Sequence, residues 1–404
     1  SKDVSEVKET YNWPKYIESS LGKNKDTVLE TVKNFKGGVF LGAPVQSTDA
    51  QVLENIHRTN ISNEKIIEIT KTGEGYGGNS FSEIILGLPG DSKNAHFKSM
   101  FDMIDLGINV VRAHQLLMLP GSEISTLEAR EKYGIKTKFR LQPKCFGDYE
   151  VYGDVIHCSE IDELCVENNT MPYEDYLKCR KLDLSVEIFY NNGIFYELKC
   201  FLEKLGIKTS YFIEKINEKA SESLLKELYG NFIKENEDCL WESYDKLEEH
   251  IKGDGMIEKY IVEKLRDNEQ LKYRAIAFFR RMDDLHGVAF ESARELLRET
   301  GFLDELKEKY LNELSDFSLL MKKELLNLDI VENRKFSFNF LKLLEKKFEV
   351  DPFDFMEETE INFFHTKEQK RLFEGYLNQF GKTENDLGII LSRSHANKFY
   401  RMVR

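Results

Sequence analysis

The sequence predicts an α/β protein: a partial (β/α) TIM-type barrel of parallel strands, followed by a mainly α-helical domain. Three apolar, strand-like runs each end at a tight polar or Gly/Pro turn, within residues 38–49, 82–92 and 109–123. Helical sequence separates the runs, which is typical of consecutive βα units. In such folds ligands bind at the carboxyl ends of the strands, so we expect the functional site in these turns.

Capping residues and apolar stripes predict the elements of the first part in order. Asn24, Asp49, Asn63 and Ser92 each precede a stripe with helical spacing and suit a helix start. The glycine-rich bend at 73–78 lacks the Lys-Ser/Thr of a phosphate cradle, so a flexible connector is favoured. Between these segments we predict strands at 39–45, 81–86 and 110–117.

The character of the chain changes after the third strand. Residues 121–170 show no clear period and predict a long, irregular excursion over the barrel mouth. Pro172 suits the first position of a helix, and charged helical stripes continue from there to about residue 344. We therefore predict three parts: the later half of a barrel at 1–150, a mainly helical domain at 151–350 and a small α+β element at 351–404.

Composition excludes several classes of function. The 404 residues carry a net charge of −14, which argues against broad binding to nucleic acid or to an anionic membrane. No run approaches the roughly 18–20 apolar residues of a membrane span, and the polar first residues do not form a secretory signal. Six scattered cysteines favour reduced thiols. These observations predict a cytosolic, cytoplasmic protein.

The motifs at the strand ends resemble those of a known family. Gln46-Ser-Thr-Asp49, Glu83-Ile-Ile-Leu-Gly-Leu-Pro-Gly90 and Val111-Arg-Ala-His-Gln115 are similar to later βα units of radical S-adenosylmethionine (radical SAM) enzymes. The stretch Glu167-Asn-Asn-Thr-Met-Pro-Tyr-Glu-Asp-Tyr-Leu-Lys-Cys-Arg180, with Glu187-Ile-Phe-Tyr-Asn191, resembles the subgroup with a cobalamin-binding domain. The resemblance covers the first half of the chain well and the helical remainder loosely.

The resemblance implies a SAM site at the strand ends. In this family an iron–sulfur cluster of the 4Fe-4S type reduces SAM, which splits to a 5′-deoxyadenosyl radical, while the protein positions the groups and excludes water. By resemblance, Gln46 and Ser47 would lie near the ribose or methionine end of SAM. The backbone of Ile85, Gly87 and Leu88 would flank the adenine. The floor of the site would be formed by Arg112, His114 and Gln115.

The cysteines depart from the family pattern. The family holds its cluster with three cysteines spaced CxxxCxxC, whereas no two of the six cysteines here lie within four residues of each other. We therefore expect a fragment whose cluster ligands, and any cobalamin domain, are not in this chain. The sheet edge left by missing strands predicts self-association. The sequence does not indicate whether the substrate is a small molecule or a peptide.

Simpler interpretations stay open for the same residues. Gln46 and Ser47 also suit an ordinary strand-end turn, and His114, flanked by apolar residues, also suits a buried core histidine. Arg112 could instead pair with Glu83 or Asp105.

The cysteines have their own alternatives. Cys145 fits a free cysteine better than a ligand of an auxiliary cluster. Cys158 and Cys165, with the neighbouring His157, only distantly resemble a metal-binding pair.

The favoured hypothesis is the carboxy-terminal portion of a radical SAM enzyme, performing methyl transfer in the intact parent if cobalamin is present. This chain alone is then expected to be inactive. The alternative is a catalytically inactive helical interaction module on a decayed barrel. A third option is an unrelated βα-barrel enzyme that uses Glu83 or His114 as acid–base groups.

Overall fold

The computed structural model describes residues 2–11, 17–19, 30, 39–42, 45–60, 62, 67, 79–263, 265 and 268–404. The chain divides into two compact units: residues 1–140 with 162–183, and residues 141–161 with 184–404. Each unit is described by itself below. The predicted helices at Asn24 and Asn63 and the bend at 73–78 lie almost entirely outside the described residues.

The first unit holds a four-stranded parallel sheet in the order β1 (Ile17–Ser19), β2 (Val39–Gly42), β3 (Asn79–Leu86) and β4 (Val110–Gln115). The predicted strands at 39–45, 81–86 and 110–117 are thereby confirmed within a few residues. A parallel sheet with intervening helices makes the protein mixed α/β, as predicted, while closure into a TIM-type barrel stays a prediction.

Helices α3 (Ala50–Asn55) and α5 (Lys93–Asp105) follow β2 and β3, and the predicted caps are confirmed. Asp49 accepts hydrogen bonds from the main-chain N–H groups of Gln51 and Val52, and Ser92 accepts one from Ala95. These bonds satisfy N–H groups that the first helical turn leaves without partners. Helix α1 (Lys2–Tyr11) precedes the sheet, and α7 (Tyr173–Ser185) runs out of the first unit at residue 183.

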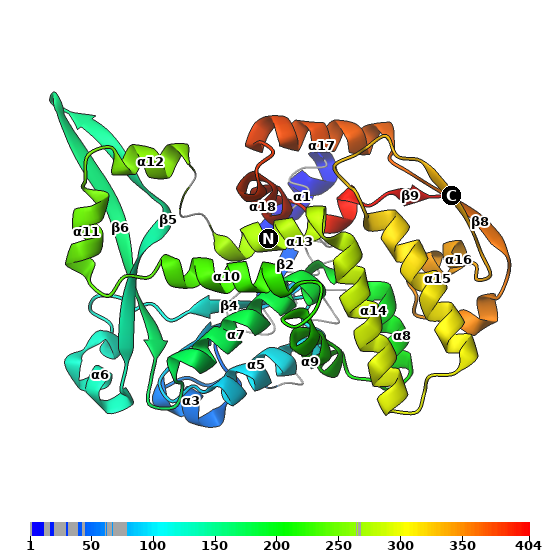
Figure 1. The fold of residues 1–404 in the computed structure, drawn as a ribbon, viewed down its shortest axis with the longest axis horizontal. Helices are drawn as coiled ribbons and strands as arrows, with labels where there is room; N and C mark the ends of the chain where they lie inside the picture. Colours follow the sequence, from blue (N-terminus) through cyan, green and yellow to red (C-terminus); the bar gives the residue numbers. More distant parts are fainter. Residues whose placement is uncertain are drawn as a thin grey trace. The chain divides into compact units, whose positions relative to one another are not determined.

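The prediction of an irregular excursion at 121–170 is wrong. After a short turn at Glu123–Ser125 and α6 (Leu127–Tyr133), the chain forms a long two-stranded hairpin, β5 (Lys136–Val151) and β6 (Asp154–Glu167) (Figure 1). Pro143 lies within β5, and in a two-stranded ribbon both strands are edges, where proline is tolerated. Tyr152 and Gly153 connect the strands with positive φ angles of 55° and 93°, as a tight hairpin turn requires.

The second unit is mainly helical, as the charged stripes predicted. A π-helix (Val186–Tyr190) and a 3-10 turn (Asn191–Gly193) lead into it, and α13 contacts both α10 and α18 (Figure 1). Its α-helices are α8 (Tyr196–Lys204), α9 (Thr209–Ala220), α10 (Lys226–Asp238), α11 (Tyr244–Ile251), α12 (Met256–Val262), α13 (Glu269–Arg280), α14 (Met282–Glu299), α15 (Glu305–Lys322), α16 (Phe340–Glu345), α17 (Lys367–Phe380) and α18 (Glu384–Arg393).

A small antiparallel sheet completes this unit, with the order β7 (Glu332–Phe336), β8 (Thr359–Phe364) and β9 (Met402–Val403). Two 3-10 turns accompany it, at Pro352–Phe355 and Ala396–Phe399. An α+β element near the carboxyl end was predicted, although its first strand lies before residue 351. Among the described helices, none is long and apolar enough to cross a membrane.

Candidate functional site

The carboxyl ends of three neighbouring segments meet around Ile85 in β3. On one side, the Ile85 N–H donates to the carbonyl of Gln46 at 2.8 Å, and the Gln46 N–H donates to the carbonyl of Glu83 at 2.9 Å. On the other side, Ile85 is in register with His114 of β4. Through its two bonds, Gln46 pairs with Ile84, the residue before Ile85. Because adjacent strands lie about 4.8 Å apart, the main chains of Gln46 and His114 lie on the two sides of β3, roughly 10 Å from each other. The structure therefore brings these predicted residues to one edge of the sheet.

Gln46 has two features that an ordinary turn residue lacks. Its φ of 60° lies in the left-handed region, which is uncommon for a residue with a side chain. Its side-chain Oε1 is buried and accepts no hydrogen bond within the described part of the chain. A strained backbone and an unsatisfied buried oxygen both cost free energy, and such features concentrate at functional positions.

One face of β3 and β4 carries exposed charged groups. Alternating residues of a strand lie on the same face, so Glu83 and Ile85 of β3 share it with Arg112 and His114 of β4. His114 Nε2 lies 3.4 Å from Glu83 Oε1, and these side chains are 54% and 42% exposed. The interpretation of His114 as a buried core histidine is therefore wrong.

Arg112 lies directly across from Glu83 in the register of β3 and β4. Its side chain is exposed, and it forms no ion pair with any residue that the structure describes. Of the two structural partners expected for Arg112, Glu83 is thus adjacent to it but is paired with His114. The face presents a carboxylate, an imidazole and a guanidinium to solvent.

Gln115 lies on the opposite face of β4. Its side-chain oxygen accepts a hydrogen bond from Arg140 Nη1 at 2.5 Å, and its amide nitrogen donates to the Tyr176 hydroxyl on α7. Because successive side chains of a strand alternate, Gln115 cannot share a floor with Arg112 and His114. The structure does not bring it to the other predicted floor residues.

Ser47 belongs to the interior. It is 3% exposed, its hydroxyl lies 3.3 Å from that of Ser99 on α5, and it accepts a hydrogen bond from the Asp49 N–H at 3.1 Å. Its carbonyl accepts from the Asn60 side chain at 2.7 Å. These bonds hold the segment between β2 and α3, so the structure gives Ser47 a positioning role behind Gln46.

The turn after β3, residues 87–91, is shaped by the buried carboxylate of Asp91. One oxygen accepts from the Gly87 N–H at 3.0 Å and the other from the Ser92 N–H at 2.9 Å. Burial raises the pKa of Asp91 to about 6, although the nearby His96 and the two N–H donors oppose the rise. Gly87 has a φ of 91°, which favours glycine. The turn is therefore built around one carboxyl group.

Side chains from distant segments hold the carbonyls of the same turn. Asn55 Nδ2 donates to Pro89 O at 2.9 Å, and Asn168 Nδ2 donates to Leu88 O at 3.1 Å. The Thr170 hydroxyl donates to Asp91 O at 2.6 Å. Asn168 and Thr170 lie in the segment 167–180 that resembles the cobalamin-associated subgroup, but their bonds to this turn were not predicted. The run Asn168-Asn169-Thr170 directly after β6 could have indicated this role, because amide and hydroxyl side chains often bond to nearby main-chain groups.

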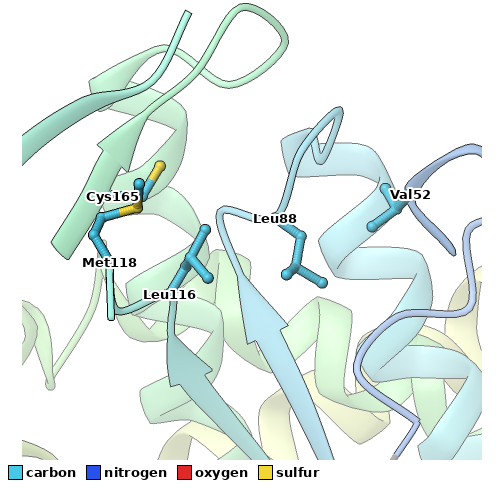
Figure 2. Close-up of a cluster of buried hydrophobic side chains, with 5 residues drawn as sticks. All are labelled: Val52, Leu88, Leu116, Met118 and Cys165. Carbon is cyan, nitrogen blue, oxygen red and sulfur yellow. The ribbon is translucent and has the colours of Figure 1, made fainter. Parts of the chain in front are cut away.

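Leu88 turns its side chain into a buried apolar cluster rather than toward the open face. Figure 2 shows Leu88 and Leu116 just beyond the ends of neighbouring strands, with Val52 on one side and Met118 and Cys165 on the other. A Cβ added to Gly87 would lie 3.4 Å from Cys165 O, so β6 approaches this turn closely. Only main-chain groups of Gly87 and Leu88 remain for a ligand, and several already bond within the protein.

The cysteines form no evident metal site in the described residues. Cys165 is fully buried, and this burial raises the pKa of its thiol to about 12, while Cys158 is exposed. Within the described ranges, no three His, Cys, Asp or Glu side chains are grouped to hold a metal ion. A thiol that resists ionisation is a poor metal ligand.

A second buried network lies behind the turn, between α5 and α7. His96 Nε2 lies 2.8 Å from Asp183 Oδ1, and Arg180 Nη1 donates to Asp183 Oδ2 at 3.2 Å. Burial lowers the pKa of His96, but the charge and hydrogen bond of Asp183 outweigh it, so the pKa is raised. Asp183 thus favours the charged form of His96, which lies near Asp91.

Two known proteins are similar to this chain. The cobalamin-dependent radical SAM methyltransferase TokK from Streptomyces tokunonensis is 25% identical over 221 residues, which are 53% of this chain and 32% of TokK. A 2-(S-pantetheinyl)-carbapenam-3-carboxylate methyltransferase from Streptantibioticus cattleyicolor is 26% identical over 211 residues, 51% of this chain and 30% of that protein.

The chain therefore spans about a third of the length of the curated relatives that it matches. No protein-family model matches it. The two similarities support a relation to the radical SAM superfamily.

Proposed function

We propose that this chain is the carboxy-terminal portion of a radical SAM enzyme and supplies part of its SAM site at the carboxyl edge of β2, β3 and β4. The observation that carries the proposal is the unsatisfied, buried Oε1 of Gln46, whose main chain bonds to β3 at the carboxyl edge of the sheet. The similarity to TokK supports it, and methyl transfer with cobalamin in the intact, cytoplasmic parent is part of the proposal.

The residues present fit SAM in part. SAM carries an amino group, a carboxylate, a sulfonium and ribose hydroxyls. The carboxyl edge of the sheet offers an acceptor in Gln46, and one face of β3 and β4 offers an anion in Glu83 and a cation in Arg112. We infer that Gln46 Oε1, which has no hydrogen-bond donor in the described part of the chain, accepts a hydrogen bond from SAM. Ser47, Leu88 and Gln115 are engaged within the protein, so we assign them to positioning.

When bound and reduced by one electron, SAM supplies a 5′-deoxyadenosyl radical in this family. The chain's own residues would bind and orient it and exclude water from one side. The turn at 87–91, held by Asp91, Asn55 and Asn168, would keep the main chain beside the ligand fixed. In the part of the chain that the structure describes, no three His, Cys, Asp or Glu side chains are grouped to hold a 4Fe-4S cluster.

Calorimetric titration of the full chain with SAM tests the proposal, using Gln46→Gly as the variant. Glycine accepts a φ of 60° without strain, so this variant should keep or gain stability. Its affinity for SAM should fall by about fivefold, which corresponds to the loss of one hydrogen bond. Gln379→Ala, an exposed glutamine on α17, is the control and should bind like the wild type. Equal affinity in all three proteins would contradict the assignment of Gln46.

The alternative proposal is a catalytically inactive helical interaction module on a decayed barrel. Two observations are compatible with this alternative: TokK matches only 53% of the chain, and the given sequence contains no CxxxCxxC. The module predicts no saturable binding of SAM or of S-adenosylhomocysteine. Anaerobic reconstitution with iron and sulfide should give no cluster absorbance under either proposal. A stoichiometric cluster would contradict the prediction that the cysteines of this chain are not cluster ligands.

A further inference from the structure

A cavity of about 670 Å³ opens in the helical unit, and neither the sequence motifs nor the proposed SAM site accounts for it. Helices α10, α11, α12, α13 and α18 supply most of its lining, and the segments between these helices and Leu141 of β5 supply the rest. Its volume falls in the range of small-molecule sites, roughly 300–1,000 Å³. The lining is divided between carboxylates and apolar or aromatic side chains.

The charged part of the lining is strongly acidic. Four carboxylates face one ammonium group, that of Lys272, which donates to Glu235 Oε2 at 2.7 Å. The other three carboxylates, of Asp238, Glu263 and Glu384, form no ion pair with any described residue. Such a lining disfavours an anion and attracts a cation, because like charges repel across a cavity with low-dielectric walls.

Aromatic rings form a continuous wall beside these carboxylates. The Trp241 ring lies 4.9 Å from that of His250, and the Tyr260 ring lies 6.3 Å from His250 and 5.7 Å from Phe146, between ring centroids. Trp241 and Tyr260 line the cavity itself. The faces of such rings attract organic cations, and packing against neighbours holds them in place.

We propose that this cavity binds a small organic cation, an ammonium group bearing apolar substituents. The carboxylates supply the opposite charge, the two rings supply cation–π contacts, and Val262 and Leu265 supply apolar surface for the substituents. The site is formed by the helical unit alone and does not depend on SAM binding at the sheet.

Choline and its neutral isostere 3,3-dimethylbutanol test the proposal, because they differ in charge and hardly in shape. The chain has two tryptophans, Trp13 and Trp241, so Trp13→Phe leaves Trp241 as the single fluorescence reporter inside the cavity. Choline should change this fluorescence saturably and bind about tenfold more tightly than the alcohol. No saturable change, or equal affinity for both probes, would overturn the proposal.

A pair of neighbouring substitutions on α10 separates the cavity from the general negative charge of the protein. Asp238→Asn removes a lining carboxylate and should weaken choline binding by about threefold to fivefold. Glu237→Gln removes an exposed carboxylate that does not line the cavity and should leave the affinity unchanged. Both positions are exposed, so folding should persist, which circular dichroism checks. Equal effects of the two variants would place choline elsewhere.

Discussion

Two buried histidines, one in each unit, have pKa values that are shifted in opposite directions. His96 on α5 is 1% exposed and its pKa is raised, whereas His286 on α14 is 2% exposed and its pKa is lowered to about 3. Burial lowers the pKa of both. The difference comes from their neighbours: a carboxylate faces His96, and the ammonium group of Lys322 lies near His286.

The comparison shows that burial alone does not decide the charge of a histidine. Asp183 supplies both a hydrogen bond and a negative charge to His96. His286 instead lies 3.0 Å from the carbonyl of Met282 and 2.9 Å from the hydroxyl of Ser318, both neutral groups. Lys322, which ion-pairs with Glu197, adds a repulsive charge. The surroundings thus favour the charged form of the buried histidine in the first unit and the neutral form in the second.

Lys322→Met should produce the largest effect, because it removes the cation near His286 and leaves Glu197 buried without its partner. Breaking a buried ion pair in this way costs about 3–5 kcal/mol. Urea unfolding at pH 7 should show this loss. The double variant with Glu197→Gln should recover part of the stability, and failure to do so would contradict the pairing as the cause.

Asp183→Asn should remove the interaction that raises the pKa of His96. Without the carboxylate, the buried His96 loses the charge that raises its pKa, and Arg180 loses a partner. We expect a loss of about 3 kcal/mol in the free energy of unfolding and a fall in the pKa of His96, followed by NMR titration. Asp175→Asn, in the partly exposed first turn of the same helix, is the control and should change stability little. An unchanged His96 pKa would refute the argument.

The dependence of stability on pH should separate the histidines. The pKa of His286 in the folded state, about 3, lies below the unfolded value of about 6.5, so the folded state binds fewer protons between these values. Its contribution is complete above pH 6.5 and falls by about 2 kcal/mol at pH 5. For His96 the sign is reversed: the contribution is present below pH 6.5 and is lost as the pH rises through the raised pKa.

Urea unfolding at pH 7 and pH 5 measures this effect, with His286→Gln as the partner variant. The difference between the wild type and the variant cancels the titration of other groups, including Asp91. The variant should lose less stability on acidification than the wild type. An equal loss in both proteins would mean that His286 is not the responsible group.

The smallest effect is expected at the exposed pair of Glu83 and His114. Both side chains are about half exposed, so water and salt screen their attraction. Glu83→Gln should change the free energy of unfolding by less than about 0.5 kcal/mol, measured by the same urea titration. A large loss would show that this face is covered in solution, in contrast to the exposed fractions of these two side chains.

Much of the local structure could be predicted because its causes are local. Asp49 and Ser92 cap helices through their own side chains, and the apolar run of β3 needs no distant partner to be recognised. The face of Gln115 was also predictable in principle, since alternation along β4 separates it from His114. The hairpin of β5 and β6 was missed because each strand is stabilised by hydrogen bonds to the other, and the composition of the segment does not indicate this pairing.

By itself, the sequence determined the parallel strands, the helix starts, the charge balance and the approximate edge of the sheet where Gln46, Ile85 and His114 lie. Only the tertiary structure decided which of these side chains are available. Asn55, Asn168 and Thr170 converge on the turn at 87–91 from segments far apart in the chain, and Leu88 is withdrawn into an apolar cluster. Propensity acts between near neighbours, whereas burial and hydrogen-bond satisfaction depend on which distant segments meet.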